Sequence, residues 1–165
     1  DHLGERTGAA VQPRVLLFGH SRGAQLALRF TELHPEQVTA VAAVSAGTYT
    51  LPSDSADFPY GVADVARDDG GLQFNPQQFL GVPVWIGVGA LDTNPADVPH
   101  AWDAYIGKNR VERARTFART LQQLGGDASL TVFPGADHGL TQQMCTQALD
   151  DLAAEEAAHS PGHDA

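Results

Sequence analysis

Residues 14–30 read RVLLFGHSRGAQLALRF, and this stretch decides the fold. The continuous apolar run at 14–18 is typical of a strand buried on both faces of a sheet. Apolar residues at 24, 27, 28 and 30 predict a helix over 24–33 that packs on that sheet. Between the two, Gly19–Gly23 matches the pattern G-x-S-x-G, which places a serine at a sharp strand-to-helix turn.

The same alternation of strand and helix continues along the chain. Apolar runs predict further strands at 38–45, 82–89 and 129–133, and helical spacing predicts helices over 110–124 and from 141 onward. The positions expected to face the core are Val111, Ala114, Phe117, Ala118, Leu121 and Leu124 in the first helix, and Met144, Ala148, Leu149 and Leu152 in the second. This order predicts an α/β fold, with a mostly parallel sheet and flanking helices. Two long connections, 48–80 and 93–109, follow strand ends, where α/β proteins place their chemistry.

Length and composition exclude several classes of protein. The 165 residues predict a single domain over 1–159 with a disordered tail at 160–165, and the 42% apolar content is that of a globular protein. With 20 acidic against 10 basic residues, the net charge of −10 repels phosphate backbones and anionic lipid. No apolar run is long enough to span a membrane. We therefore expect neither nucleic acid nor membrane as a partner, and composition leaves the oligomeric state open.

The chain contains one cysteine, Cys145. A lone cysteine excludes an internal disulfide and any multi-cysteine metal site. The absence of disulfides leans toward a reducing, cytoplasmic compartment.

The turn at Ser21 has the sequence that a nucleophilic serine requires. Small residues at 19 and 23 keep neighbouring backbone from clashing at a strained position. The start of the following helix favours a developing negative charge, and the backbone N–H of Arg22 would point at an oxyanion. The alternative is a glycine-rich turn with an incidental serine.

A serine needs a base and an orienting carboxylate. His138 follows the strand at 129–133 in the segment FPGADHG, and Asp92 follows the strand at 82–89 in VGALD. Both therefore lie at the same edge of the sheet as Ser21. We predict His138 as the base and Asp92 as the acid. Turn chemistry and solvated charge are the expected roles of the other nearby carboxylates, namely Asp97, Asp103 and Asp137.

Other polar and aromatic residues allow alternative interpretations. Asp97, His100 and Asp103 have the spacing of a metal-binding helix face, but Pro95 and Pro99 argue against a regular helix there, so we expect no metal. His20 either lines the site or packs. Solvation of a helix face is the expected role of Arg110, Arg113, Arg115 and Arg119. An apolar pocket and a satellite core are equally compatible with Tyr49, Phe58, Tyr60, Phe74, Phe79, Trp102 and Tyr105.

With GHSRG as elbow, GALD as acid turn and GADHG as histidine loop, the chain resembles the α/β-hydrolase superfamily. The segments HPEQVTAVAAVSAGTY and LDTNPADVP look most similar to bacterial esterases of the polyhydroxybutyrate-depolymerase and feruloyl-esterase group. The resemblance implies a serine esterase without a cofactor, acting on a small-molecule ester through an acyl-enzyme on Ser21. It implies His138 as base and Asp92 as acid.

The resemblance covers the second half of the superfamily's fold. Members place several strands before the elbow strand, and a loop among them supplies a second oxyanion N–H, whereas thirteen residues precede Arg14 here. We therefore expect the chain to be the C-terminal portion of a longer hydrolase, with its elbow strand as an exposed apolar edge. The alternatives are a non-catalytic half-fold that binds or assembles, or a serine peptidase or acyltransferase with the same triad.

Overall fold

Four parallel strands form the centre of the molecule in the computed structural model, which describes Arg6 and residues 14–65 and 74–159. The strands are β1 (Val15–His20), β2 (Val38–Val44), β3 (Val84–Gly89) and β4 (Ala128–Phe133). They lie in the order β1-β2-β3-β4, and every neighbouring pair is parallel. Consecutive strands are thus joined by helical crossovers, and the predicted α/β fold with a parallel sheet is confirmed.

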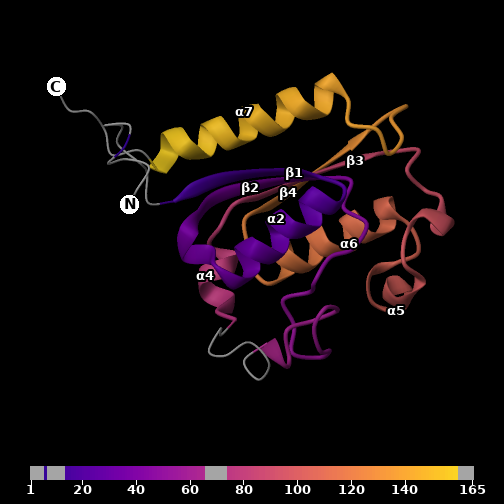
Figure 1. Cartoon of the computed structure of the whole chain (residues 1–165), viewed down its shortest axis with the longest axis horizontal. Coiled ribbons are helices and arrows are strands. Elements are labelled where there is room, and N and C mark those ends of the chain that lie inside the picture. Colours follow the sequence, from indigo (N-terminus) through magenta and orange to yellow (C-terminus); the bar gives the residue numbers. More distant parts are fainter. Residues whose placement is uncertain (1–5, 7–13, 66–73, 160–165) are drawn as a thin grey trace.

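Helices cover both faces of this sheet (Figure 1). One face carries α7 (Gln142–His159), and the other carries α2 (Arg22–Leu33) and α6 (Arg110–Gln123). Shorter helices lie in the connections: η1 (Pro35–Gln37), α4 (Pro76–Leu80), η2 (Pro95–Asp97), η3 (His100–Trp102) and α5 (Asp103–Ile106). Each face has its own hydrophobic core. None of the helices in the described ranges is both long and apolar enough to cross a bilayer.

Two residues predicted to face the core are exposed instead. Leu149 is 60% exposed because α7 packs through Met144, Ala148 and Leu152, and the next residue after Ala148 is turned by about 100° toward solvent. Leu124 is 49% exposed because it lies beyond the end of α6. The predicted disordered tail, 160–165, lies outside the described residues.

A helix inside the first long connection was not predicted. The helix α4 starts at Pro76, and the side chain of Asn75 caps it by accepting a hydrogen bond from the backbone N–H of Gln78. An asparagine followed by proline is a recognised helix start, so the sequence did contain this signal.

The strand β1 lies at one edge of the described sheet. Val15 and Phe18 are 46% and 41% exposed, so the prediction of a strand buried on both faces is wrong. Among the described strands β1 pairs with β2 alone, which leaves its other side without a partner. The other expectation for this strand, an exposed apolar edge, is confirmed for the described residues.

Candidate active site

Ser21 occupies the turn between β1 and α2. Its φ of 55° lies in the left-handed region, which costs free energy for any residue with a side chain. A hydrogen bond of 2.8 Å from its N–H to the carbonyl of Val44 ties the turn to β2. A Cβ on Gly19 would lie 2.4 Å from the backbone of Gly23, so the predicted need for glycine before the serine is confirmed. At Gly23 itself a Cβ would meet nothing within 4 Å among the described residues, so crowding there does not explain the second glycine.

The turn after β3 and the loop after β4 are joined through their backbones. The N–H of Ala90 donates to the carbonyl of Phe133, and the N–H of Leu91 donates to the carbonyl of Ala136, both at 2.9 Å. Because β3 and β4 are neighbours in parallel, both segments leave the same edge of the sheet. The two bonds fix the predicted acid and the predicted base relative to each other.

Gly89 lets these two segments approach so closely. A Cβ at this position would lie 2.2 Å from the carbonyl oxygen of Asp137, so any side chain would push the loop away. The carboxylate of Asp137 accepts a hydrogen bond from the N–H of Gly139, which is the turn role expected of it.

The structure brings Ser21, His138 and Asp92 into one hydrogen-bonded chain. His138 Nδ1 lies 2.9 Å from Asp92 Oδ2, and its Nε2 lies 3.1 Å from Ser21 Oγ. A carboxylate only accepts hydrogen bonds, so Nδ1 carries the proton and the bare Nε2 accepts from the serine hydroxyl. The carboxylate is 2% exposed, whereas the imidazole is 38% exposed and thus open to a substrate.

Arg110 does not solvate a helix face, so the prediction for it is wrong. The residue is 8% exposed, and its Nη1 donates to Asp92 Oδ1 at 2.9 Å while its Nη2 donates to the carbonyl of Asp97 at 2.8 Å. Both oxygens of the predicted acid are therefore bonded, one to the base and one to Arg110. Arg115 and Arg119 are exposed, as predicted.

Arg113 is also wrongly predicted, because it is fully buried. Its guanidinium donates to the carbonyls of Gly47, Gly107 and Pro99 at 2.6, 2.8 and 2.9 Å, and to the carboxylate of Asp103 at 2.8 Å. One side chain thus ties the segment after β2 to the long connection before α6. That connection forms part of the site, as described below.

The carboxylate of Asp103 is shared between His100 and Arg113 rather than placed for a metal. The hydrogen bond from His100, together with Arg113, holds the pKa of this carboxyl below its usual value. The segment around it forms short 3₁₀ turns, in line with the prolines, and Asp97 is exposed. In the described part of the chain, no three His, Cys, Asp or Glu side chains come together as a metal site.

The aromatic residues of the connections mostly form cores. Tyr49 and Phe79 are 1% exposed within the core beneath α2 and α6, and Tyr49 stacks on Phe117. Tyr60 contacts Trp102 and Tyr105 in a separate cluster. Phe58 is 45% exposed and Phe74 packs against Phe79. None of the seven predicted aromatics is among the described residues that line the cavity beside the serine.

His20 packs against the loop of the base. Its Nε2 lies 2.9 Å from the backbone carbonyl of His138, and because a carbonyl only accepts, the imidazole donates. Of the two roles left open for His20, lining the site or packing, the structure favours packing, against the loop that carries His138.

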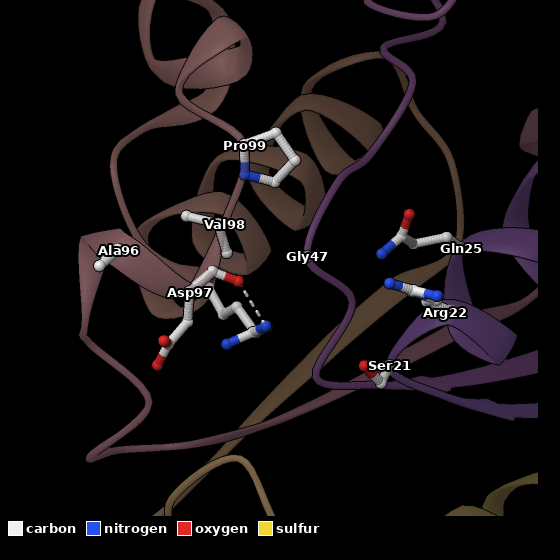
Figure 2. Close-up of a pocket in the computed structure, with 9 residues that line it drawn as sticks. Ser21, Arg22, Gln25, Gly47, Ala96, Asp97, Val98 and Pro99 are labelled. Carbon is white, nitrogen blue, oxygen red and sulfur yellow. Dashed lines mark hydrogen bonds between the residues drawn. The ribbon is translucent and has the colours of Figure 1, made fainter.

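A cavity of about 620 Å³ opens beside Ser21 (Figure 2). Arg22 and Gln25 from α2 line one side of it, the segment 96–99 lines the other, and Gly47 lies between them. Gln25 and Gly47 were not predicted as residues of the site. The signal for Gln25 was its position one helical turn after the serine, which places both side chains on one face of α2.

Solved structures of hydrolases have the same arrangement of strands and helices. Poly(aspartic acid) hydrolase-1 from Sphingomonas sp. KT-1 superposes on 94% of this chain with a TM-score of 0.69 and 24% identity. LpqC, a poly(3-hydroxybutyrate) depolymerase from Bordetella parapertussis, superposes on 91% with a TM-score of 0.63 and 24% identity. Esterase PE8 superposes on 93% with a TM-score of 0.55 and 24% identity. The chain shares its α/β fold with the matched part of these hydrolases.

The similarity covers part of each hydrolase. The chain spans 58%, 52% and 55% of the lengths of these three proteins. No family model and no curated protein sequence matches it. The comparison therefore establishes a shared α/β fold over the matched part, and the reaction has to be argued from the site.

Proposed function

We propose that the chain carries the nucleophile, base and acid of a serine hydrolase that cleaves carboxylic esters. The single observation behind this proposal is the chain of hydrogen bonds from Asp92 through His138 to Ser21, at 2.9 and 3.1 Å. A serine held at φ 55° at the start of a helix supports the same reaction, because a strained backbone here presents the hydroxyl above the sheet.

In the first half of the reaction, Ser21 Oγ attacks the acyl carbon and its proton moves to His138 Nε2. Asp92 stabilises the resulting imidazolium through Nδ1–H. The negative charge on the carbonyl oxygen faces the start of α2, where the N–H of Arg22 is one of the amides without a partner inside the helix. The ester C–O bond then breaks, and the alcohol leaves with the proton from His138.

In the second half, a water molecule attacks the acyl-enzyme. His138 takes a proton from this water and returns it to Ser21 Oγ as the C–O bond to the serine breaks. The acid is released and the resting protonation states are restored. Each proton in the cycle is carried by His138, so the proton transfers need no second base.

Esters are proposed as the substrate class on the support of two fold neighbours. One is named as an esterase and one as a poly(3-hydroxybutyrate) depolymerase. The same three side chains cleave amides in other enzymes. A p-nitrophenyl ester and the p-nitroanilide of the same acid therefore form the deciding substrate pair, and we expect turnover of the ester.

The mechanism is tested by labelling the protein with a fluorophosphonate and measuring its intact mass. We expect one adduct, which is lost in Ser21→Ala and His138→Ala. Turnover of the ester should fall at least about 10⁴-fold in both variants. The exposed residues Ser129 and His159 provide matched controls, Ser129→Ala and His159→Ala, which should keep both adduct and activity. Folded protein that neither takes the label nor turns over the ester would contradict the proposal.

A further inference from the structure

The cavity beside Ser21 has a specific donor chemistry on its α2 side. Gln25 accepts a hydrogen bond from Thr48 Oγ1 at its Oε1, at 2.8 Å. The Thr48 hydroxyl in turn accepts from Arg29 Nη2 at 2.9 Å, so its own hydrogen is directed to Gln25. The oxygen of the Gln25 amide is thereby occupied, and its NH₂ group is turned toward Gly47 and the cavity (Figure 2).

Arg22 adds a positive charge on the same side of the cavity. Its side chain is exposed, and it makes no hydrogen bond or ion pair with any of the described residues. Arg110 lies on the opposite side, but Asp92 offsets most of its charge at 2.9 Å. The unpaired cation of the cavity is therefore Arg22.

Gly47 keeps the space in front of these donors open. A Cβ on Gly47 would lie 3.2 Å from Gln25 Nε2 and 3.7 Å from Arg110 Nε. Arg110 Nε is buried and has no hydrogen-bond partner among the described residues. The cavity thus reaches the backbone between the Gln25 NH₂ group and Arg110 Nε–H, and a buried N–H group such as that of Arg110 normally has an acceptor.

Within the described part of the cavity, no acidic side chain accepts a hydrogen bond from these donors. Both oxygens of Asp92 are bonded, one to His138 and one to Arg110. The carboxylate of Asp97 points away from Arg22 and Gln25 (Figure 2). An acceptor for the donors has to come with the ligand.

We propose that this cavity binds a carboxylate carried by the acyl part of the substrate, so that the preferred substrates are half-esters of dicarboxylic acids. This inference rests on the proposed function. The acyl part is assigned because the leaving alcohol has to face His138, and His138 is not among the residues that line the cavity. The carboxylate accepts from the Gln25 NH₂ and pairs with Arg22, the geometry of a charge-assisted hydrogen bond.

The test compares the turnover of two p-nitrophenyl esters that have the same acyl chain and differ in its far end. One is p-nitrophenyl hydrogen glutarate, which carries a free carboxylate, and the other is its methyl-capped neutral counterpart. We expect kcat/KM to be about tenfold or more higher for the charged ester. The preference should fall as salt rises, because Arg22 is exposed to screening.

Three substitutions locate the preference in the cavity. Arg22→Gln removes the cation, Gln25→Glu replaces the donor by a like charge, and Gly47→Ala places a methyl group against the Gln25 amide. Each should lower the ratio of charged to neutral kcat/KM toward 1, and Gln25→Glu should bring it below 1. The matched controls are Arg115→Gln and Gln123→Glu, which make the same charge changes at exposed positions of α6 and should keep the parent ratio.

The outcomes separate this inference from the proposed function. Equal turnover of both esters by a Ser21-dependent enzyme overturns the carboxylate subsite and leaves the hydrolase intact. A preference that persists in all three cavity variants also overturns it. If neither ester is cleaved, the proposed function fails, and calorimetry with glutarate then decides the subsite. Binding to the Ser21→Ala protein that is lost on adding Gly47→Ala supports it, and no binding at millimolar glutarate overturns it.

Discussion

The ring of His20 lies 5.2 Å from the ring of His138, at an interplanar angle of 34°. The residue immediately before the serine therefore contacts the histidine that follows β4, and its Nε2–H holds the backbone carbonyl of that histidine. One turn of the chain positions two members of the site. It presents the hydroxyl of Ser21, and it fixes the backbone of the base that accepts the proton of that hydroxyl.

We predict that His20→Phe lowers kcat and leaves KM almost unchanged. Phenylalanine keeps an aromatic ring against His138 but cannot donate to its carbonyl, so the base is less well aligned with the serine. Misalignment of a catalytic group on this scale costs roughly tenfold or more in rate. Steady-state kinetics on the ester substrate measure the effect, with His159→Phe as the control. An unchanged kcat would show that the contact has no part in positioning the base.

Gly89→Ala should disrupt the acid and base together. The new methyl group would lie 2.2 Å from the carbonyl of Asp137, so the loop that carries His138 has to move. We expect fluorophosphonate labelling to be strongly slowed and the free energy of unfolding to fall by about 1–3 kcal/mol. Gly81→Ala is the matched control, because a Cβ there makes only ordinary contacts at 3.4 and 3.5 Å. Normal labelling of Gly89→Ala would contradict the close approach.

Arg113→Met should be among the most destabilising substitutions in the chain. It removes four hydrogen bonds and leaves the carbonyls of Gly47 and Gly107, one buried and one half-buried, without a partner among the described residues. Each buried acceptor that is left unsatisfied costs about 1–3 kcal/mol. Urea unfolding measures the difference. Arg115→Met, two residues along α6 and exposed, should stay within about 0.5 kcal/mol of the parent. Similar stabilities for the two variants would contradict the role of Arg113.

Glu32 should make the free energy of unfolding fall as the pH rises, which is opposite to the usual effect of a carboxyl group. The residue is 3% exposed, one of its oxygens has no partner among the described residues, and burial raises its pKa well above the ordinary 4.5, against the opposing effect of Arg29. Above pH 4.5 the unfolded chain releases this proton while the folded chain retains it. The stability contributed by protonated Glu32 is therefore complete below that pH and is lost as pH rises toward the folded pKa.

The slope of this loss is at most about 1.4 kcal/mol per pH unit. Glu32→Gln should remove it, so the variant gains stability relative to the parent as pH rises from 5 to 7. Urea unfolding of Glu32→Gln and of the parent at several pH values measures the difference. A flat difference for Glu32→Gln would mean that Glu32 is ionised in the folded protein.

The position of the candidate site could be predicted because Ser21, Asp92 and His138 each lie in the turn or loop that follows a short apolar run. In a parallel sheet the ends of such runs meet at one edge, so the order of strands was enough to bring the three together. The close approach at Gly89 and the backbone bonds of Ala90 and Leu91 are details of the same edge.

The two buried arginines could not be predicted in this way. Arg110 and Arg113 alternate with the apolar positions of α6, as solvent-facing residues do, and the pattern of a helix says nothing about the loops that cover it. Most of their acceptors are backbone carbonyls at 47, 97, 99 and 107, whose positions depend on how two connections fold. A carbonyl has the same chemistry in every residue, so the sequence carries no signal for such partners.

The anchoring of the connection between Thr93 and Pro99 by α6 has a consequence for engineering. The arginines hold this segment by its main chain, at the carbonyls of Asp97 and Pro99, and the side chain of Asn94 caps η2 by accepting from the N–H of Ala96 at 3.1 Å. The segment 93–97 is exposed and one side of it faces the cavity. A library that keeps Asn94 and varies the side chains at 93, 96 and 97 can explore new specificities while the backbone contacts of the two arginines stay in place.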